Sequence, residues 1–369
     1  MTDEIKIKEG QTEFFIPSEF SSGGPGKITS SVFFNRQMAF NRDVSVMLLR
    51  SLDTEMTAVD CMSASGSRAV RIANEVPKMT VTANDRDPKA YELIKKNIEC
   101  NNLENCVATH RDMNALLGEN VYDYVDVDPF GSPIPFLASA IRGCRRNGIL
   151  AITATDTAPL AGAHRKKCER RYGAKPIKGP MCHESGLRIL MSSLARELAK
   201  FDRGMEPILS FYADHYYRTY VRIKEGADNA DATLGKLIWV SYDYNTLERH
   251  ASKEHSAEFQ YGPLWGGPLH NKEILNKMDP TGMADEKRCV KMLNLWRDEL
   301  DHIPFSYEIS EVASHVKISS PGREELLEAM NKRGRATRSH VSPTVFRTDL
   351  ELKEMLEAFR EASPDNRTQ

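Results

Sequence analysis

Short apolar runs alternate with segments of helical length over roughly the first 155 residues. The segment 40–52 predicts an amphipathic helix, because Val44, Met47 and Leu48 fall on one face. Further helices are expected at 87–99 and 133–145. Four apolar runs have the length of buried strands: 57–61, 79–83, 122–127 and 149–153. This alternation predicts βαβ units and a parallel sheet covered by helices on both faces.

Two further β-rich runs, 207–213 and 217–223, lie too close together for a helix between them, so we expect an antiparallel pair. The composition then becomes polar and turn-rich at 226–229. The sequence therefore predicts an α/β, doubly wound (Rossmann-like) domain with an N-terminal extension at 1–228. A second, smaller α+β domain is expected at 229–369.

The second part of the chain has a weaker pattern. A segment rich in tryptophan and glycine at 261–269 is followed by expected helices at 287–301 and 323–332 and by a strand-like run at 336–346. Residues 307–346 fit either a winged-helix-like unit or an ordinary α+β cap, and the pattern does not decide between the two.

Composition narrows the class of protein. The chain has 369 residues, 40% hydrophobic and 28% charged, which suits two globular domains. It has no apolar run of the roughly 18 residues that a membrane span needs, and no secretory signal at its N-terminus. A soluble, cytoplasmic protein is the expectation. Its seven cysteines form no CxxC pair, so reduced thiols are expected rather than disulfides or a metal site.

The net charge of -2 hides two basic clusters. The first combines His164, Arg165, Lys166, Lys167, Arg170 and Arg171. The second contains Lys332, Arg333, Arg335 and Arg338. Either cluster fits a solvated charged face or a surface that contacts phosphates, and its position relative to the catalytic motifs has to decide.

Polar residues follow successive expected strands, at the sheet edge where ligands bind in doubly wound folds. After the first strand come Asp60 and a run of small residues that ends at Gly66, Ser67 and Arg68. Such a run lets backbone N–H groups and a helix N-terminus approach a ligand closely. A plain turn is the alternative interpretation.

Asp85 follows the second strand, 19 residues past Gly66, close to the spacing at which an acid receives ribose hydroxyls. Asp112 and Met113 follow the third, where a carboxylate accepts from an adenine amino group and a thioether packs on the ring. Either acid alone also fits a helix N-cap. The loop lacks the GxGxxG spacing, so adenosylmethionine is favoured over a nicotinamide cofactor.

The fourth strand leads into Asp128-Pro129-Phe130-Gly131. Methylation of an exocyclic amine needs acceptors for the amine hydrogens and an aromatic ring that holds the base. Asp128, the Pro129 carbonyl and Phe130 supply all three. A strand-ending turn with a core phenylalanine is the alternative.

With these motifs the sequence closely resembles the archaeal type of the tRNA guanine-N2 dimethyltransferase family, which acts on position 26. The resemblance covers nearly the whole chain. The matching segments include 33–36, 41–43, 63–66, 128–133, 153–160, 162–164, 182–184, 214–218, 262–265 and 337–344.

The resemblance implies a seven-stranded class I methyltransferase domain that uses S-adenosyl-L-methionine and gives N2-methyl- and N2,N2-dimethylguanosine. Asp128 and Pro129 would accept from the amine between the rings of Phe130 and Phe33. Arg42 would reach the cofactor's carboxylate. The other implied cofactor residues are Asp60, Ser67, Arg68, Asp85, Asp112 and Met113. The implied tRNA-binding residues are His164, Arg165, Lys166, Arg170, Arg171 and Arg338.

One departure from the family concerns metal. Some members carry cysteine pairs before the Gly-Pro-Leu-Trp segment, whereas residues 244–261 contain no cysteine here, so we expect no zinc site. Two rival functions stay open at this stage. One is amine methylation of another substrate, such as adenine N6 or a protein glutamine, and the other is tRNA binding without catalysis. The sequence indicates no obligate protein partner.

Overall fold

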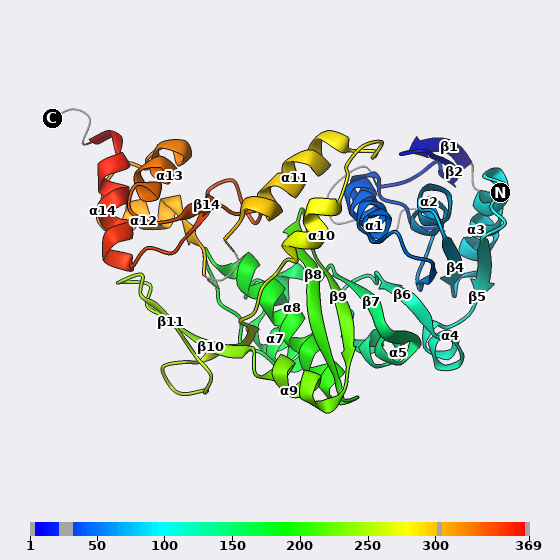
Figure 1. The fold of residues 1–369 in the computed structure, drawn as a ribbon, viewed down its shortest axis with the longest axis horizontal. Coiled ribbons are helices and arrows are strands. Elements are labelled where there is room, and N and C mark those ends of the chain that lie inside the picture. Colours follow the sequence, from blue (N-terminus) through cyan, green and yellow to red (C-terminus); the bar gives the residue numbers. More distant parts are fainter. Residues whose placement is uncertain (1–3, 22–31, 301–304, 366–369) are drawn as a thin grey trace.

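The computed structural model describes residues 4–21, 32–300 and 305–365. At its centre lies a seven-stranded sheet in the order β5-β4-β3-β6-β7-β9-β8 (Figure 1). Its strands are β3 Met56–Asp60, β4 Met79–Asp85, β5 Cys106–His110, β6 Tyr122–Val127, β7 Cys144–Ala154, β8 Arg203–Ala213 and β9 Tyr216–Glu225. β3 to β7 run parallel, and β9 pairs antiparallel with both β7 and β8. The predicted doubly wound fold with a terminal antiparallel pair is confirmed.

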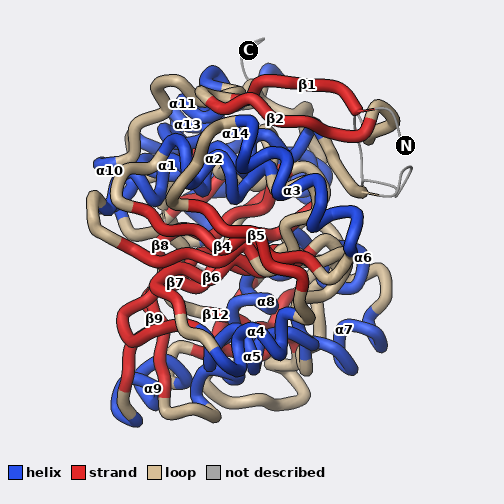
Figure 2. Tube along the Cα trace, turned by 90° about the vertical axis from the view of Figure 1, so that its right-hand side faces the viewer, coloured by secondary structure: helices blue, strands red, loops and turns tan. Residues whose placement is uncertain are grey.

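Helices cover both faces of this sheet (Figure 2). One face carries α1 Ala39–Leu52, α2 Ser67–Glu75 and α3 Pro88–Cys100, and the other carries α4 Met113–Glu119, α5 Leu137–Gly143 and α8 Cys182–Ala199. Tyr124 and Val125, neighbours on β6 that point to opposite faces, are both fully buried. The expected helix at 133–145 is shorter, because its last residues already belong to β7, which begins at Cys144 after the 3-10 turn Ile134–Phe136 and α5.

An N-terminal hairpin packs on α2 and α3 at the outer side of the first helical layer (Figure 2). It consists of β1 Glu4–Glu9 and β2 Thr12–Pro17. Phe14 and Ile16 have no exposed surface and share a cluster with Val70 of α2. The hairpin therefore belongs to the core of the sheet domain.

The chain after β9 returns to both faces of the sheet. It forms α9 Ala227–Leu234, β10 Leu237–Tyr242, β11 Arg249–Ser252, β12 Tyr261–Trp265, α10 Lys272–Lys277 and α11 Glu286–Asp298. Trp265 joins the core beside α8, whereas Trp296 packs against Phe211 at 5.0 Å between ring centroids. Residues from both sides of the predicted domain boundary at 228 therefore share the same core clusters. That the chain folds as two units divided at this boundary stays a prediction.

The residues near the C-terminus pack in a core cluster of their own, at the far end of the molecule from the N-terminal hairpin (Figure 1). Its elements are β13 Tyr307–Glu308, α12 Ile309–Val316, α13 Arg323–Asn331, β14 Ala336–Arg338, β15 Val345–Thr348 and α14 Leu352–Ala362. The small antiparallel sheet has the order β13-β15-β14, so its first strand pairs with its last. Two helices followed by such a strand pair fit the winged-helix alternative. No described helix is long and apolar enough to cross a membrane.

Candidate active site

The carboxyl ends of three parallel strands bring the predicted acids to one edge of the sheet. In the sheet register Asp60 of β3 lies between Ala83 of β4 and Asp126 of β6. Asp85 ends β4, and Asp128 follows β6 by one residue. Residues that are separated by up to 68 positions in sequence therefore face the same space.

The loop after β3 is built for close approach to the start of α2. Gly66 has a φ of +75°, and a Cβ placed there would lie 3.0 Å from the Ile94 side chain, so glycine is required. As the N-cap residue of α2 it has no side chain to bond the first N–H groups of the helix. Ser63 anchors the loop by donating its N–H to the Asn84 carbonyl at 2.8 Å. The first N–H groups of α2 and the positive end of its helix dipole suit a polar ligand.

Asp85 holds this loop in place rather than capping a helix. Its Oδ2 accepts from the Ala64 N–H at 2.8 Å, and its Oδ1 accepts from the Asp87 N–H at 2.9 Å. The N-cap of α3 is Asp87. Each carboxylate oxygen can accept a second hydrogen bond, so Asp85 can still receive ligand hydroxyls. The helix-cap interpretation is wrong for Asp85.

Asp112, in contrast, does cap a helix. Its Oδ1 accepts from the N–H groups of Asn114 and Ala115 at the start of α4, at 2.9 and 3.3 Å. Its Oδ2 can serve a ligand at the same time. Met113, the first residue of α4, is 4% exposed and packs in the core beside the sheet.

Asp60 is a deeply buried acid of this edge, with 3% of its surface exposed. Burial raises its pKa to about 7, against the lowering effect of the Arg68 guanidinium. A carboxyl group with this pKa is poised to lose its proton when a cation binds beside it. Ser67 and Arg68, the first residues of α2, are each 6% exposed.

Asp128 stands at the mouth of the site with 17% of its side chain exposed. Arg68 Nη2 donates to its Oδ2. Pro129 is buried behind it, and the exposed ring of Phe130 meets the ring of Phe33 edge to face, with 4.6 Å between centroids. The structure thus brings together all four residues that the sequence predicts for catalysis.

A buried ion pair lies next to this motif, and neither of its residues was predicted as a site residue from the sequence. Arg218 of β9 donates from Nη1 to Asp126 Oδ1 at 2.9 Å and from Nη2 to Oδ2 at 2.6 Å. Both side chains are fully buried. Burial opposes ionisation of Asp126, but the guanidiniums of Arg218 and Arg68 lower its pKa below the usual value. The available signal was a charged residue, Arg218, next to the start of the β-rich run 217–223.

Arg68 links this pair to the catalytic motif. Its Nη1 donates to Asn41 Oδ1 at 2.7 Å and to Ser45 Oγ at 2.8 Å, while its Nε lies 3.7 Å from Asp126 Oδ2. The guanidinium plane is therefore held from α1 and β6 before it reaches Asp128. We infer that Arg68 positions the Asp128 carboxylate in addition to any contact with the cofactor.

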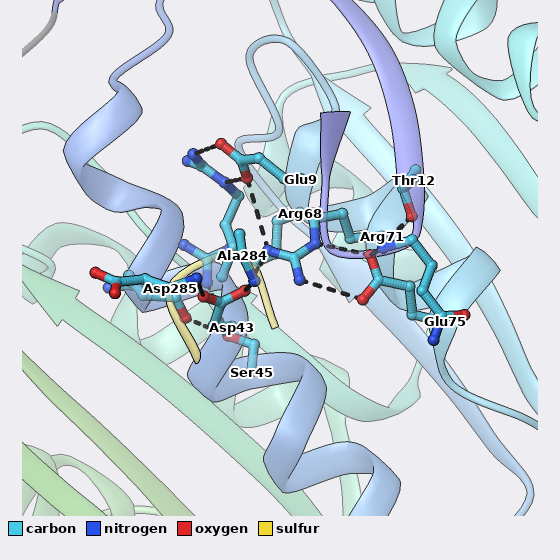
Figure 3. Close-up of polar contacts among 12 residues, drawn as sticks. Glu9, Thr12, Asp43, Ser45, Arg68, Arg71, Glu75, Ala284 and Asp285 are labelled. Atoms are coloured by element: carbon cyan, nitrogen blue, oxygen red, sulfur yellow. Dashed lines mark hydrogen bonds and ion pairs between the residues drawn. The ribbon is translucent and has the colours of Figure 1, made fainter. Parts of the chain in front are cut away.

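Arg42 occupies a different network, which Figure 3 shows around Arg71. Glu9 of β1 binds the Arg42 guanidinium through Nε at 2.8 Å and Nη2 at 2.6 Å. Arg71 Nη1 lies 2.7 Å from Asp43 Oδ1 and 3.6 Å from Glu9 Oε2. Arg42 is 5% exposed. The predicted contact of Arg42 with the cofactor stays a prediction.

The same network also ties the loop before α11 to α1. Asp43 accepts from the N–H groups of Ala284 and Asp285 at 3.0 and 2.8 Å, which fixes the loop before α11 (Figure 3). Residues 241 positions apart are joined in this way. The Asn-Arg-Asp segment at 41–43 thus joins the hairpin, the first helix and the C-terminal half of the chain.

The first basic cluster forms α7, Arg165–Tyr172, and is tied to the catalytic motif. Arg171 Nη1 donates to Asp156 Oδ2 at 3.0 Å, and Tyr172 Oη donates to Oδ1 of the same residue. The N–H of Asp156 in turn donates to the Gly131 carbonyl at 3.3 Å. The predicted tRNA-binding residues of this cluster are all exposed: His164, Arg165, Lys166, Arg170 and Arg171.

The second basic cluster is largely paired with acids. Lys332 lies 3.3 Å from Glu328, and Arg333 binds Glu357 at 2.8 Å. Arg338 Nη2 donates to Glu324 at 2.6 Å. These exposed pairs weaken the positive potential of the surface, and a tRNA contact by Arg338 stays a prediction.

One group of metal-ligating side chains comes together among the described residues: His270, Glu299 and His340. Glu299 Oε1 already accepts from Arg347 Nε at 2.8 Å, and Oε2 lies 2.5 Å from His340 Nδ1. The guanidinium beside the only carboxylate of the group repels a second cation. The cluster joins the C-terminal unit to α11, and the expected absence of a structural metal stays a prediction.

Comparisons with known proteins match this chain over nearly its whole length. A family model described as N2,N2-dimethylguanosine tRNA methyltransferase matches residues 16–360. A tRNA (guanine(26)-N(2))-dimethyltransferase of Pyrococcus horikoshii is 37% identical and covers 96% of this chain and 98% of its own length. The corresponding protein of Pyrococcus abyssi is 38% identical, with 94% and 96% covered.

A solved structure shares the fold. It is the complex of Trm1 from Pyrococcus horikoshii with S-adenosyl-L-methionine, which superposes with a TM-score of 0.89 at 37% identity. The match covers 96% of this chain and 99% of the solved one.

Proposed function

The chain belongs to the N2,N2-dimethylguanosine tRNA methyltransferase family, and from this premise we propose which of its residues carry out the reaction. The protein transfers methyl groups from S-adenosyl-L-methionine to the 2-amino group of guanosine 26 in tRNA. The observation that carries the assignment is the position of Asp128 beside the Phe33–Phe130 ring pair, at the edge that Asp60 and Asp85 share. Methylation of adenine N6 and tRNA binding without catalysis are not favoured.

The acids of the sheet edge suit the cofactor, which when bound supplies an electrophilic methyl group. The buried Asp60 fits an ammonium group, Asp85 fits ribose hydroxyls, and Asp112 Oδ2 fits an amino group of the base. Met113 would contact the adenine ring from the core side. The N–H groups of Ser67 and Arg68 at the start of α2 complete this set.

Asp128 and Pro129 would orient the guanine amine. Arg68 occupies Asp128 Oδ2, so Oδ1 can accept one amine hydrogen while the Pro129 carbonyl accepts the other. Phe33 and Phe130 would hold the base by contact with its ring. Because a guanine inside the tRNA stack cannot reach this edge, its nucleotide has to swing out. The positive charge that develops on the amine during transfer strengthens the hydrogen bond to Asp128.

We expect Asp85→Ala to weaken cofactor binding by about 1.5 to 3 kcal/mol, the usual size of hydrogen bonds that involve a charged group. The identity of the methylated product should not change. Titration calorimetry with S-adenosyl-L-methionine measures the effect directly. Asp87→Ala is the matched control, because it removes the helix cap two residues away and should reduce stability by about 1 kcal/mol without affecting cofactor affinity. Equal affinities of the Asp85 variant and the wild type would refute the assignment.

The exposed cations of α7 would contact the tRNA backbone next to the flipped guanosine. We expect a variant with glutamine at positions 165, 166, 170 and 171 to bind tRNA more weakly and with a flatter salt dependence. Each lost phosphate contact should remove about 0.7 to 0.9 from the slope of log affinity against log salt concentration.

Filter-binding assays at several salt concentrations measure this slope. Lys200→Gln with Lys224→Gln is the control, since these lysines lie at the opposite edge of the sheet, before β8 and at the end of β9. A slope that falls equally in both variants would show that α7 has no special role. We further propose that the enzyme acts in the cytoplasm and needs no obligate protein partner.

A further inference from the structure

A groove of about 500 Å³ lies between α7 and the small sheet of β10, β11 and β12. Arg165 and Lys175 line it together with Trp239 and His255. Its floor is fixed by two backbone hydrogen bonds between Lys175 and Gly262, at 2.8 and 2.9 Å. None of these groove residues except Arg165 has a part in the function proposed above.

The groove contains the one tryptophan of this chain that is not buried, Trp239. Trp265 and Trp296 have no exposed surface, whereas Trp239 is partly exposed. The exposed His255 ring lies 6.2 Å from it at an interplanar angle of 64°. Trp239 pairs with Ser252 in the β10–β11 ladder, so its backbone is held in the sheet while its side chain lines the groove.

Two cations line the same groove, together with the carboxylate of Glu169. Arg165 is exposed and bonded to Glu169 at 2.8 Å, and Lys175 is half-buried above the Tyr261 ring at 4.8 Å. Burial, with Arg165 nearby, lowers the pKa of Lys175. A phosphate between Arg165 and Lys175 would offset both the desolvation of Lys175 and its repulsion by Arg165. Cations and an aromatic ring in one groove match a nucleotide of an unpaired segment, whose base can splay onto the ring.

Helix α7 connects this groove to the catalytic motif. Arg171 and Tyr172 contact Asp156, which is bonded to Gly131. Arg165, Glu169 and the C-cap residue Gly173 line the groove along the length of the helix. The helix has eight residues, so it spans about 12 Å. One RNA strand can therefore cross α7 from the catalytic edge to the groove.

We propose that the groove binds a second, unpaired nucleotide of the substrate tRNA, with its base on Trp239 and its phosphate between Arg165 and Lys175. The proposal rests on the function proposed above, because the same tRNA places its guanosine at Asp128. The groove would act as a second anchor that raises affinity for tRNA without taking part in methyl transfer.

Tryptophan fluorescence tests this proposal on the full chain. Unmodified tRNA transcript should protect Trp239 from acrylamide, since the two other tryptophans are already buried. Trp239→Phe should abolish the tRNA-dependent change in quenching. Trp239→Ala should raise the KM for tRNA on the order of 10-fold, as expected for one lost stacking contact, with kcat within about a factor of 2 of wild type.

Val290→Ala is the control, because Val290 is an exposed apolar residue of α11 outside the groove. It should leave KM and quenching unchanged, and melting temperatures check that each variant folds. If tRNA leaves quenching unaltered and Trp239→Ala methylates with wild-type KM, the groove is not an RNA site, although the proposed function stands. If wild-type protein methylates no guanosine in tRNA, the proposed function fails, whatever the quenching shows.

Discussion

Asp128→Ala is expected to lose on the order of 100-fold or more in methylation rate, the usual effect of removing one preorganised polar group from an active site. The hydrogen bond from the amine to Asp128 strengthens only as charge develops, so turnover should suffer far more than binding. Affinities for tRNA and S-adenosyl-L-methionine should change little. Single-turnover methylation of tRNA, followed by mass spectrometry of its nucleosides, measures the rate.

The Asp128→Ala variant should still fold, so a lower methylation rate would reflect catalysis and not stability. Arg68 retains its bonds to Asn41 and Ser45 and its contact with Asp126 when Asp128 is removed. Asp128→Asn keeps an acceptor oxygen but not the charge, and should retain more activity than the alanine variant. A near wild-type rate for Asp128→Ala, or loss of its folded structure, would mean that Asp128 is a structural turn residue.

Arg218→Met is expected to destabilise the protein by about 3 to 5 kcal/mol, because it leaves the fully buried Asp126 without its main partner. The nearest remaining cation is Arg68, 3.7 Å away and shared with Asp128. Urea denaturation measures the free energy of unfolding. Lys78→Met is the matched control, since it breaks the exposed pair of Lys78 and Asp53 and should cost at most about 1 kcal/mol.

The ion pair of Asp126 and Arg218 should also make the free energy of unfolding depend on pH. The pKa of Asp126 is lower in the folded protein than in the unfolded chain, where it is near 3.9. The stability that this shift contributes is complete above the unfolded value and is lost as the pH falls through the folded value. Wild type should therefore lose this contribution below about pH 4, and its stability advantage over Arg218→Met should be smaller at pH 3 than at pH 7. An equal difference between the two proteins at pH 7 and at pH 3 would argue against an ionised Asp126.

The sequence by itself determined the elements and the chemistry at their ends. The predicted strand at 122–127 coincides with β6, and Asp85 and Asp128 were found at strand ends because apolar runs delimit buried strands. Phe130 was found in the same motif as Asp128, whereas its aromatic partner Phe33 came from the family resemblance. Local pattern was sufficient here because parallel strands place their carboxyl ends at one edge whatever covers the sheet.

Only the tertiary structure decided which partners hold these residues. Asp126 and Arg218 are 92 positions apart, and no periodicity relates them, because their pairing depends on β7 and β9 lying antiparallel in one register. The pairing of Arg42 with Glu9 and the return of α11 to α1 are decided in the same way, by packing across long loops. Such contacts depend on which faces the folded chain brings together, and a one-dimensional pattern of polar and apolar residues does not specify that.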